Sequence, residues 1–155
     1  MANRPQELLL LLTRAERLSA RRVEQVLAEF DCSVEEWRVL ALLSDGQGHN
    51  MTAIADCAFL PPPSLTKLVD RLVDQNLVYR RTDPVDRRRI LAQLTPRGRE
   101  FWQRIDRRVR AELAPLLDPE DGEQLRVLLE RLAGTLDGGG AVTTGRTGNG
   151  VGRAR

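Results

Sequence analysis

Three consecutive arginines close the segment Asp83-Pro84-Val85-Asp86-Arg87-Arg88-Arg89. A guanidinium donates a fixed fork of N–H groups that suits phosphate oxygens, and an arginine on a projecting loop fits the narrow minor groove of DNA. A neighbouring carboxylate holds such a guanidinium in one orientation, and we expect Asp86 to do this. The same residues also fit an ordinary solvated turn, because Asp-Pro starts turns readily.

The basic residues are concentrated in one part of the chain. Residues 77–110 carry 11 basic and 4 acidic side chains, whereas the whole chain has 24 and 22. The segments on either side, 1–76 and 111–155, are each net acidic. A nearly neutral chain with one strongly basic block has the charge pattern of a nucleic-acid-binding protein.

The residues around the arginine tip predict a β-hairpin between Leu77 and Leu94. Apolar residues alternate on both sides of the tip, at Leu77 and Tyr79 before it and at Ile90, Ala92 and Leu94 after it. This alternation gives each strand one apolar face, as a half-buried antiparallel pair requires. The hairpin therefore presents the arginines on a projecting loop.

A helix from Pro63 to Gln75 directly precedes this hairpin. Its core-facing stripe has the helical repeat, at Leu65, Leu68, Val69, Leu72 and Val73. Small, hydroxyl-bearing or basic residues on the remaining surface are candidates for contacts with bases and phosphates: Pro63, Ser64, Thr66, Lys67 and Arg71. A plain solvated face is the alternative, but the basic hairpin that follows favours DNA.

Five further helices are predicted around this pair of elements. The first runs from Pro5 to about Phe30 and would be about 37 Å long, so part of its stripe, which includes Leu8, Leu11, Leu18 and Val23, is expected to meet another subunit. Ser33 and Glu36 form a capping box for the second helix. After a loop at residues 45–50, Thr52 is expected to cap a short third helix with Ile54, Cys57 and Ala58 on one face.

The last two helices are expected at Pro96 to about Leu116 and at Pro119 to about Leu136, after the caps Thr95 and Asp118. From Asp137 the chain becomes rich in glycine, and residues 137–155 are predicted to be disordered.

Composition excludes several classes of protein. A chain of 155 residues with 41% hydrophobic and 30% charged residues is typical of one globular domain. Without a signal peptide or a long apolar run, it is expected in the cytoplasm and away from membranes. His49, Cys32 and Cys57 lack metal-ligand spacing. No catalytic constellation or cofactor motif is present, so an enzyme is not expected.

Several motifs together resemble the MarR family of bacterial transcription regulators. They are Met51-Thr52-Ala53-Ile54-Ala55, Pro63 through Leu72, Asp83 through Arg88, and Leu94-Thr95-Pro96-Arg97-Gly98. In the family wing pattern D-x-R-D-x-R, this chain has Val85 at the position of the first arginine. Arg87 or Arg88 is then expected to enter the minor groove, and we predict Arg88, which stands at the second arginine of the pattern. Arg89 is a further candidate at the wing.

The resemblance implies a mainly α-helical winged helix-turn-helix with a small antiparallel wing. It implies an N-terminal dimerisation helix in residues 1–32, a DNA-binding lobe in 33–98 and C-terminal dimerisation helices in 99–136. The expected function is that of a homodimeric repressor on a pseudopalindromic site in double-stranded DNA, released by a small organic effector.

By the same resemblance, the effector pocket is expected near Arg17, Arg21, Trp37 and Arg38, although arginine and aromatic side chains at helical spacing are more often packing residues. Two alternatives remain open. One is redox control through Cys32 or Cys57, which needs an exposed thiol with a lowered pKa. The other is a winged-helix module that binds proteins, since a fold does not fix its function.

Overall fold

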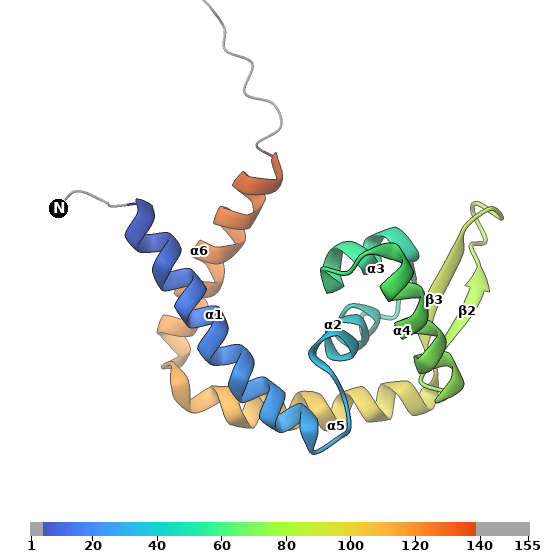
Figure 1. Ribbon diagram of the computed structural model, residues 1–155, viewed down its shortest axis with the longest axis horizontal. Coiled ribbons are helices and arrows are strands. Elements are labelled where there is room, and N and C mark those ends of the chain that lie inside the picture. Colours follow the sequence, from blue (N-terminus) through green and yellow to red (C-terminus); the bar gives the residue numbers. More distant parts are fainter. Residues whose placement is uncertain (1–4, 139–155) are drawn as a thin grey trace, which may run out of the picture. The chain divides into compact units, whose positions relative to one another are not determined.

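A computed structural model describes residues 5–138 of the protein, and Figure 1 shows its helices and small sheet. The chain divides between Pro115 and Leu116 into two compact units. None of the described helices is long and apolar enough to cross a membrane. In chain order the elements are α1 (Pro5–Ala28), α2 (Val34–Leu43), β1 (His49–Asn50), α3 (Met51–Ala58), α4 (Pro62–Asp74), β2 (Val78–Thr82), β3 (Ile90–Leu94), α5 (Pro96–Leu113), a short 3-10 turn (Ala114–Leu116) and α6 (Pro119–Gly138).

This order confirms the predicted mainly helical fold with a small antiparallel sheet. The core of the first unit lies where helices α1 to α5 and the sheet meet. Its largest fully buried side chains are Leu27, Leu40, Leu43, Ile54, Leu65, Leu72 and Ile105. The core therefore ties the N-terminal helix, the helix-turn-helix and α5 into one body.

The first helix is buried only at its C-terminal end. Val23 and Val26 are buried where α1 packs on α5, whereas Leu8, Leu11 and Leu18 of the predicted stripe are exposed in the single chain. The N-terminal half of α1 thus presents apolar surface that nothing within the first unit covers.

The N-terminus of α2 is capped as predicted. Ser33 accepts a hydrogen bond from the backbone N–H of Glu36, and the Glu36 carboxylate accepts one from the Ser33 N–H at 2.8 Å. The next cap differs from the prediction, because the side chain of Asn50 rather than Thr52 accepts from the Ala53 N–H and starts α3. Asparagine caps helices as well as threonine does, and here it is three residues before that N–H.

The sheet has three strands in the order β1-β3-β2. The segment at residues 45–50 was expected to be a loop, but His49 and Asn50 form β1 and pair with Ala92 and Leu91 of β3. The prediction placed Tyr79 on the buried face, and this was wrong: Tyr79 pairs with Gln93 and is 42% exposed, while Val78 pairs with Leu94 inside. A shift of one residue reverses the faces of a strand.

The base of the hairpin is locked to the start of α5. Thr95 caps α5 by accepting from the Gly98 N–H, and its hydroxyl donates to the Asn76 carbonyl at 2.7 Å. A Cβ at Gly98 would lie 1.9 Å from the Leu77 carbonyl oxygen, so only glycine fits there. The hairpin is thereby fixed at its base and free at its tip.

The second unit is built on α6. Its leucines at positions 125, 128 and 129 are exposed, and no residue of this helix is buried. The helix ends at Gly138, two residues beyond the expected end, and the remainder of the predicted disordered segment lies outside the described residues.

Candidate nucleic-acid interface

Helix α4 is divided into a buried and an exposed face. Leu65, Leu68, Val69 and Leu72 are buried, as predicted. The five candidate DNA contacts are all exposed: Pro63, Ser64, Thr66, Lys67 and Arg71. The Thr66 hydroxyl donates to the Pro62 carbonyl at 3.0 Å and keeps its lone pairs for accepting. The face therefore offers hydroxyl groups and one ammonium to a ligand.

Arg71 differs from the other candidates because its guanidinium has a protein partner. Its Nε lies 2.9 Å from a carboxylate oxygen of Glu36, whose side chain is only 8% exposed. Glu36 also accepts from the Ser33 N–H, so one carboxylate joins the start of α2 to the last turns of α4. Arg71 thus holds α4 in place, and its outer N–H groups remain for other contacts.

A second ion pair, which was not predicted from the sequence, joins α4 to the wing. Arg80 of β2 bonds the carboxylate of Asp70 on the exposed side of α4. Both residues are charged, but nothing in the sequence shows that a helix and a strand bring them together. This pair restrains the wing relative to α4.

The wing tip is organised by its two aspartates. Asp83 accepts from the Val85 N–H at 2.8 Å, and Asp86 accepts from the Arg88 N–H at 3.1 Å. The Asp86 carboxylate also lies 3.4 Å from the Nε of Arg89. Asp86 therefore orients Arg89, and it shapes the backbone turn that carries Arg88.

Arg87 and Arg88 remain as free guanidiniums at the tip. Both are exposed, and within residues 5–138 neither forms an ion pair. In Figure 1 the loop that joins β2 to β3 projects beyond the end of the sheet, with α4 beside the strands. Two unpaired cations on a projecting loop next to a polar helix face make a surface for a polyanion.

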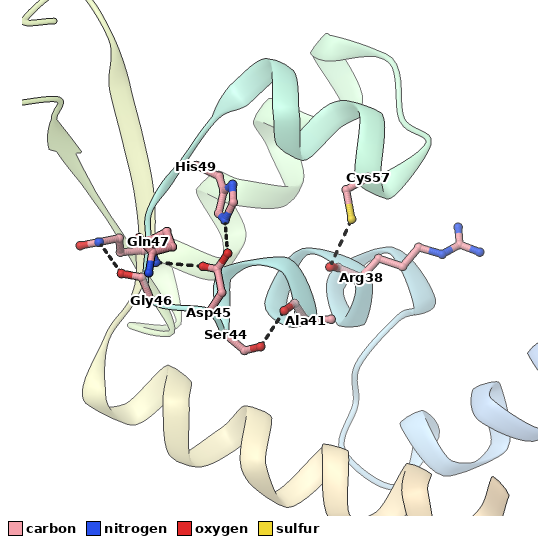
Figure 2. A network of polar contacts seen from close by, with 9 residues as sticks. Arg38, Ala41, Ser44, Asp45, Gly46, Gln47, His49 and Cys57 are labelled. Atoms are coloured by element: carbon pink, nitrogen blue, oxygen red, sulfur yellow. Dashed lines mark hydrogen bonds and ion pairs between the residues drawn. The ribbon is translucent and has the colours of Figure 1, made fainter. Parts of the chain in front are cut away.

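The loop before β1 supports the base of the wing. Figure 2 shows the carboxylate of Asp45 facing the ring of His49, with an Oδ2–Nε2 distance of 2.8 Å. Burial acts to raise the pKa of Asp45, but hydrogen bonds from the Gln47 N–H and the His49 ring outweigh it and lower the pKa below its ordinary value. Gln93 of β3 donates to the Gly46 carbonyl at 3.2 Å, which ties this loop to the sheet.

Comparison with known proteins agrees with this geometry. The model of the MarR family matches residues 30–89, which span α2 through the wing tip. An uncharacterised HTH-type transcriptional regulator of Bacillus subtilis strain 168, YhbI, is 30% identical over 114 residues, which cover 74% of this chain and 73% of that protein. This chain belongs to the MarR family of transcriptional regulators.

Other relatives of this MarR-family regulator are similar along most of their length. The HTH-type transcriptional regulator FarR of Neisseria gonorrhoeae is 25% identical, over 79% of this chain and 84% of FarR. The crystal structure of NadR in complex with 4-hydroxyphenylacetate has a TM-score of 0.73 at 26% identity, with 80% and 90% of the two chains covered. The repressor CouR bound to a 23-mer DNA duplex has a TM-score of 0.68 at 27% identity, with 79% and 89% covered.

A cleft of the MarR-family regulator contains two of the four predicted effector-binding residues. It is about 230 Å³ in volume and lies between α1, α2 and the end of α5. Trp37 and Arg38 line it, together with Ala20 and Leu113, while Arg17 and Arg21 do not. The indole N–H of Trp37 is buried and has no hydrogen-bond partner within the described residues. A buried donor without a partner is costly.

The two cysteines of the regulator have different surroundings. Burial raises the pKa of Cys32 to about 12, and the Glu36 carboxylate adds to this shift. Such a thiol is a poor thiolate source and so a poor redox sensor. Cys57 was expected to be buried but is only half-buried, because it lies beside rather than within the face formed by Ile54 and Ala58. No group of metal-ligating side chains is found in the described part of the chain.

Proposed function

We propose that this MarR-family regulator is a repressor that binds one site in double-stranded DNA as a homodimer. The observation that carries the proposal is the surface formed by α4 and the wing, where Lys67, Arg87 and Arg88 are exposed and have no carboxylate partner within residues 5–138. The DNA-bound structure of CouR supports it by analogy. The function is binding rather than catalysis, in the cytoplasm, where bacterial DNA lies.

In this proposal α4 lies in the major groove and the wing tip reaches the adjacent minor groove. Ser64, Thr66 and Lys67 contact base edges and phosphates, and Arg88 enters the minor groove. Two such lobes related by a two-fold axis have recognition helices about 34 Å apart, so the half-sites are centred about ten base pairs apart. The operator is therefore expected to be pseudopalindromic.

The dimer would form through the helices outside the DNA-binding lobe. Exposed leucines on the N-terminal half of α1, with Leu9 at 65% and Leu10 at 71% exposure, form an apolar surface. Exposed leucines of α6 form a second one. Apolar surface of this extent in a single chain marks an interface. Residues 1–32 and 99–136 are assigned to dimerisation, and residues 33–98 are assigned to DNA.

The effector is proposed to be an aromatic carboxylic acid bound in the cleft between α1, α2 and α5. A negative charge on the acid suits the cationic Arg38 side chain, and the lining residues Ala20, Trp37 and Leu113 suit an aromatic ring. NadR has been solved with 4-hydroxyphenylacetate, and a Mycobacterium tuberculosis MarR-family protein has been solved with p-aminosalicylic acid.

Selection of bound sequences from randomised duplexes tests the function. The expected result is a pseudopalindrome with half-sites about ten base pairs apart. If the dimer neutralises about 6 to 10 phosphates, its affinity falls by about 10³- to 10⁵-fold between 50 and 200 mM salt. Recovery of no common sequence, or equal retention on single-stranded DNA, would contradict the proposal.

A further inference from the structure

The turn between α3 and α4 contains an unusual residue. Phe59 ends α3 in the left-handed conformation, with φ at 55°, and its side chain is 81% exposed. Asparagine and aspartate adopt this conformation at modest cost, as Asn76 and Asp31 do here, but a bulky aromatic residue rarely does. A strained and exposed aromatic residue beside the recognition helix calls for a functional explanation.

The ring of Phe59 lies against the guanidinium of Arg38. The Cζ atom of Arg38 is 5.5 Å from the ring centroid, a cation–π distance. A second contact joins the same two elements, because the Cys57 thiol donates to the Arg38 carbonyl at 4.0 Å, and Figure 2 shows the Cys57 side chain pointing to that oxygen. Arg38 thus contacts α3 through its backbone carbonyl and the turn before α4 through its side chain.

Arg38 also lines the proposed effector cleft, next to Trp37. Within the described residues, no carboxylate lies close enough to form an ion pair with its guanidinium. Glu16, which lines the cleft as well, is 3.9 Å from Arg17. Arg38 therefore contacts the ring of Phe59 and also belongs to the lining of the cleft.

We propose that Arg38 and Phe59 are positioning residues that link the effector cleft to the DNA-reading helix. In the free protein, the stack of the guanidinium on the ring holds the turn at residues 59–61 and thereby the N-terminus of α4. A carboxylate bound in the cleft attracts the guanidinium away from the ring, and the turn loses its support. This inference rests on the proposed DNA-binding function, and its effector half rests on the proposed ligand class.

The link has a quantitative consequence. An exposed cation–π contact corresponds to about a two- to five-fold change in an equilibrium constant. Because coupling between two ligands is reciprocal, the factor by which the acid weakens DNA binding through this contact equals the factor by which DNA weakens binding of the acid. Removal of the Phe59 ring should therefore change the effect of the acid on DNA affinity and the effect of DNA on acid affinity by the same factor.

A double-mutant cycle on DNA affinity tests the stack without any effector. The variants are Phe59→Leu, Arg38→Gln and the two together, assayed on the selected duplex at fixed salt. The coupling factor between the two sites is expected to be about two- to five-fold, and the general effect of losing one positive charge cancels in the cycle. Phe59→Tyr keeps the ring and should bind like the wild type. Additive effects, with a coupling factor of one, would overturn the inference.

The effector half is tested with 4-hydroxyphenylacetate and its uncharged amide, with tryptophan fluorescence and calorimetry as readouts. In Phe59→Leu the acid should bind the free protein about two- to five-fold more tightly and should reduce DNA affinity by a correspondingly smaller factor. The amide should show neither difference. Equal acid affinity in the wild type and Phe59→Leu would overturn the link.

The two proposals fail in different ways. If the acid does not bind the wild type, the proposed effector class is wrong, and so is the proposed link from the cleft to the turn. The double-mutant cycle on DNA affinity, which uses no effector, still decides whether the stack of Arg38 on Phe59 positions α4. Thermal unfolding and gel filtration of every variant show whether it remains folded and dimeric. Since Phe59 is mostly exposed, substitutions there should leave the melting temperature and the dimeric state unchanged.

Discussion

Arg71, the one arginine of α4, and Arg87 and Arg88 of the wing tip differ in what holds them. Arg71 on α4 bonds the buried Glu36, whereas Arg87 and Arg88 at the tip have no ion-pair partner within residues 5–138. A guanidinium bonded to a buried carboxylate stabilises the scaffold, and a free one retains its charge for phosphates. Arginines in neighbouring elements therefore have different roles. Counting every arginine overestimates the positive charge that is available to bind DNA.

The largest effect is expected from Arg88→Ala at the free tip. Loss of a minor-groove guanidinium should weaken operator binding by about 10- to 100-fold and leave the melting temperature unchanged. The measurement is a binding titration at constant ionic strength. Arg107→Ala is the control, because it removes the same charge from an exposed position on α5, and gel filtration checks that this variant is still a dimer. Equal losses in the two variants would mean that the tip acts only through net charge.

The second prediction concerns the contacts of Glu36 with Ser33 and Arg71, and its effect should appear in the free energy of unfolding. Glu36→Ala removes the acceptor of the Ser33 N–H and the partner of Arg71, and we expect a loss of about 1 kcal/mol in the free energy of unfolding. Most of this loss comes from the cap, because the Arg71 guanidinium is exposed and its ion pair is screened by solvent. Urea unfolding measures it, and Glu35→Ala in the same turn is the control. Unchanged stability would contradict the structural role.

A third variant converts a fixed arginine into a free one. Asp70→Asn releases Arg80 from its carboxylate at the side of α4. The slope of log affinity against log salt should then steepen by up to about 0.9, the contribution of one additional phosphate contact. Tighter binding at low salt should accompany it. A shallower slope would show that Arg80 needs Asp70 to reach DNA at all.

The smallest effect is a pH dependence at the loop that supports the wing. The pKa of Asp45 is lowered in the folded protein, so its ionised form stabilises the fold. This contribution is complete above the unfolded-state pKa of about 3.9 and is lost as the pH falls through the folded-state pKa. Melting temperatures between pH 6 and pH 3 should fall less for Asp45→Asn than for the wild type. Parallel curves would exclude a role for this carboxylate.

The helices were predictable because their signals are local. The apolar repeat of α4 and the capping box of α2 occupy a few consecutive residues, and each appears where expected. The face of β2 was not predictable, since Leu77, Val78 and Tyr79 are consecutive apolar residues with no clear alternation. Strand β1 has two residues and is stabilised only by its pairing with β3, which no local pattern shows.

The candidate site shows the same limit. The sequence identified the exposed residues of α4 and the arginines of the tip, because both follow from periodicity and charge. It did not show which arginines are paired, since Glu36 with Arg71 and Asp70 with Arg80 join residues on different elements. Distances across elements depend on the packed core, and these distances separate a fixed guanidinium from a free one.

The structure of the dimer on its selected duplex would show directly whether the wing tip and α4 read adjacent grooves. We expect the free guanidinium of Arg88 to lie in the minor groove, while α4 occupies the adjacent major groove and Arg71 remains bonded to Glu36. A complex in which the wing tip faces solvent, with Arg88 away from the nucleotides, would contradict it.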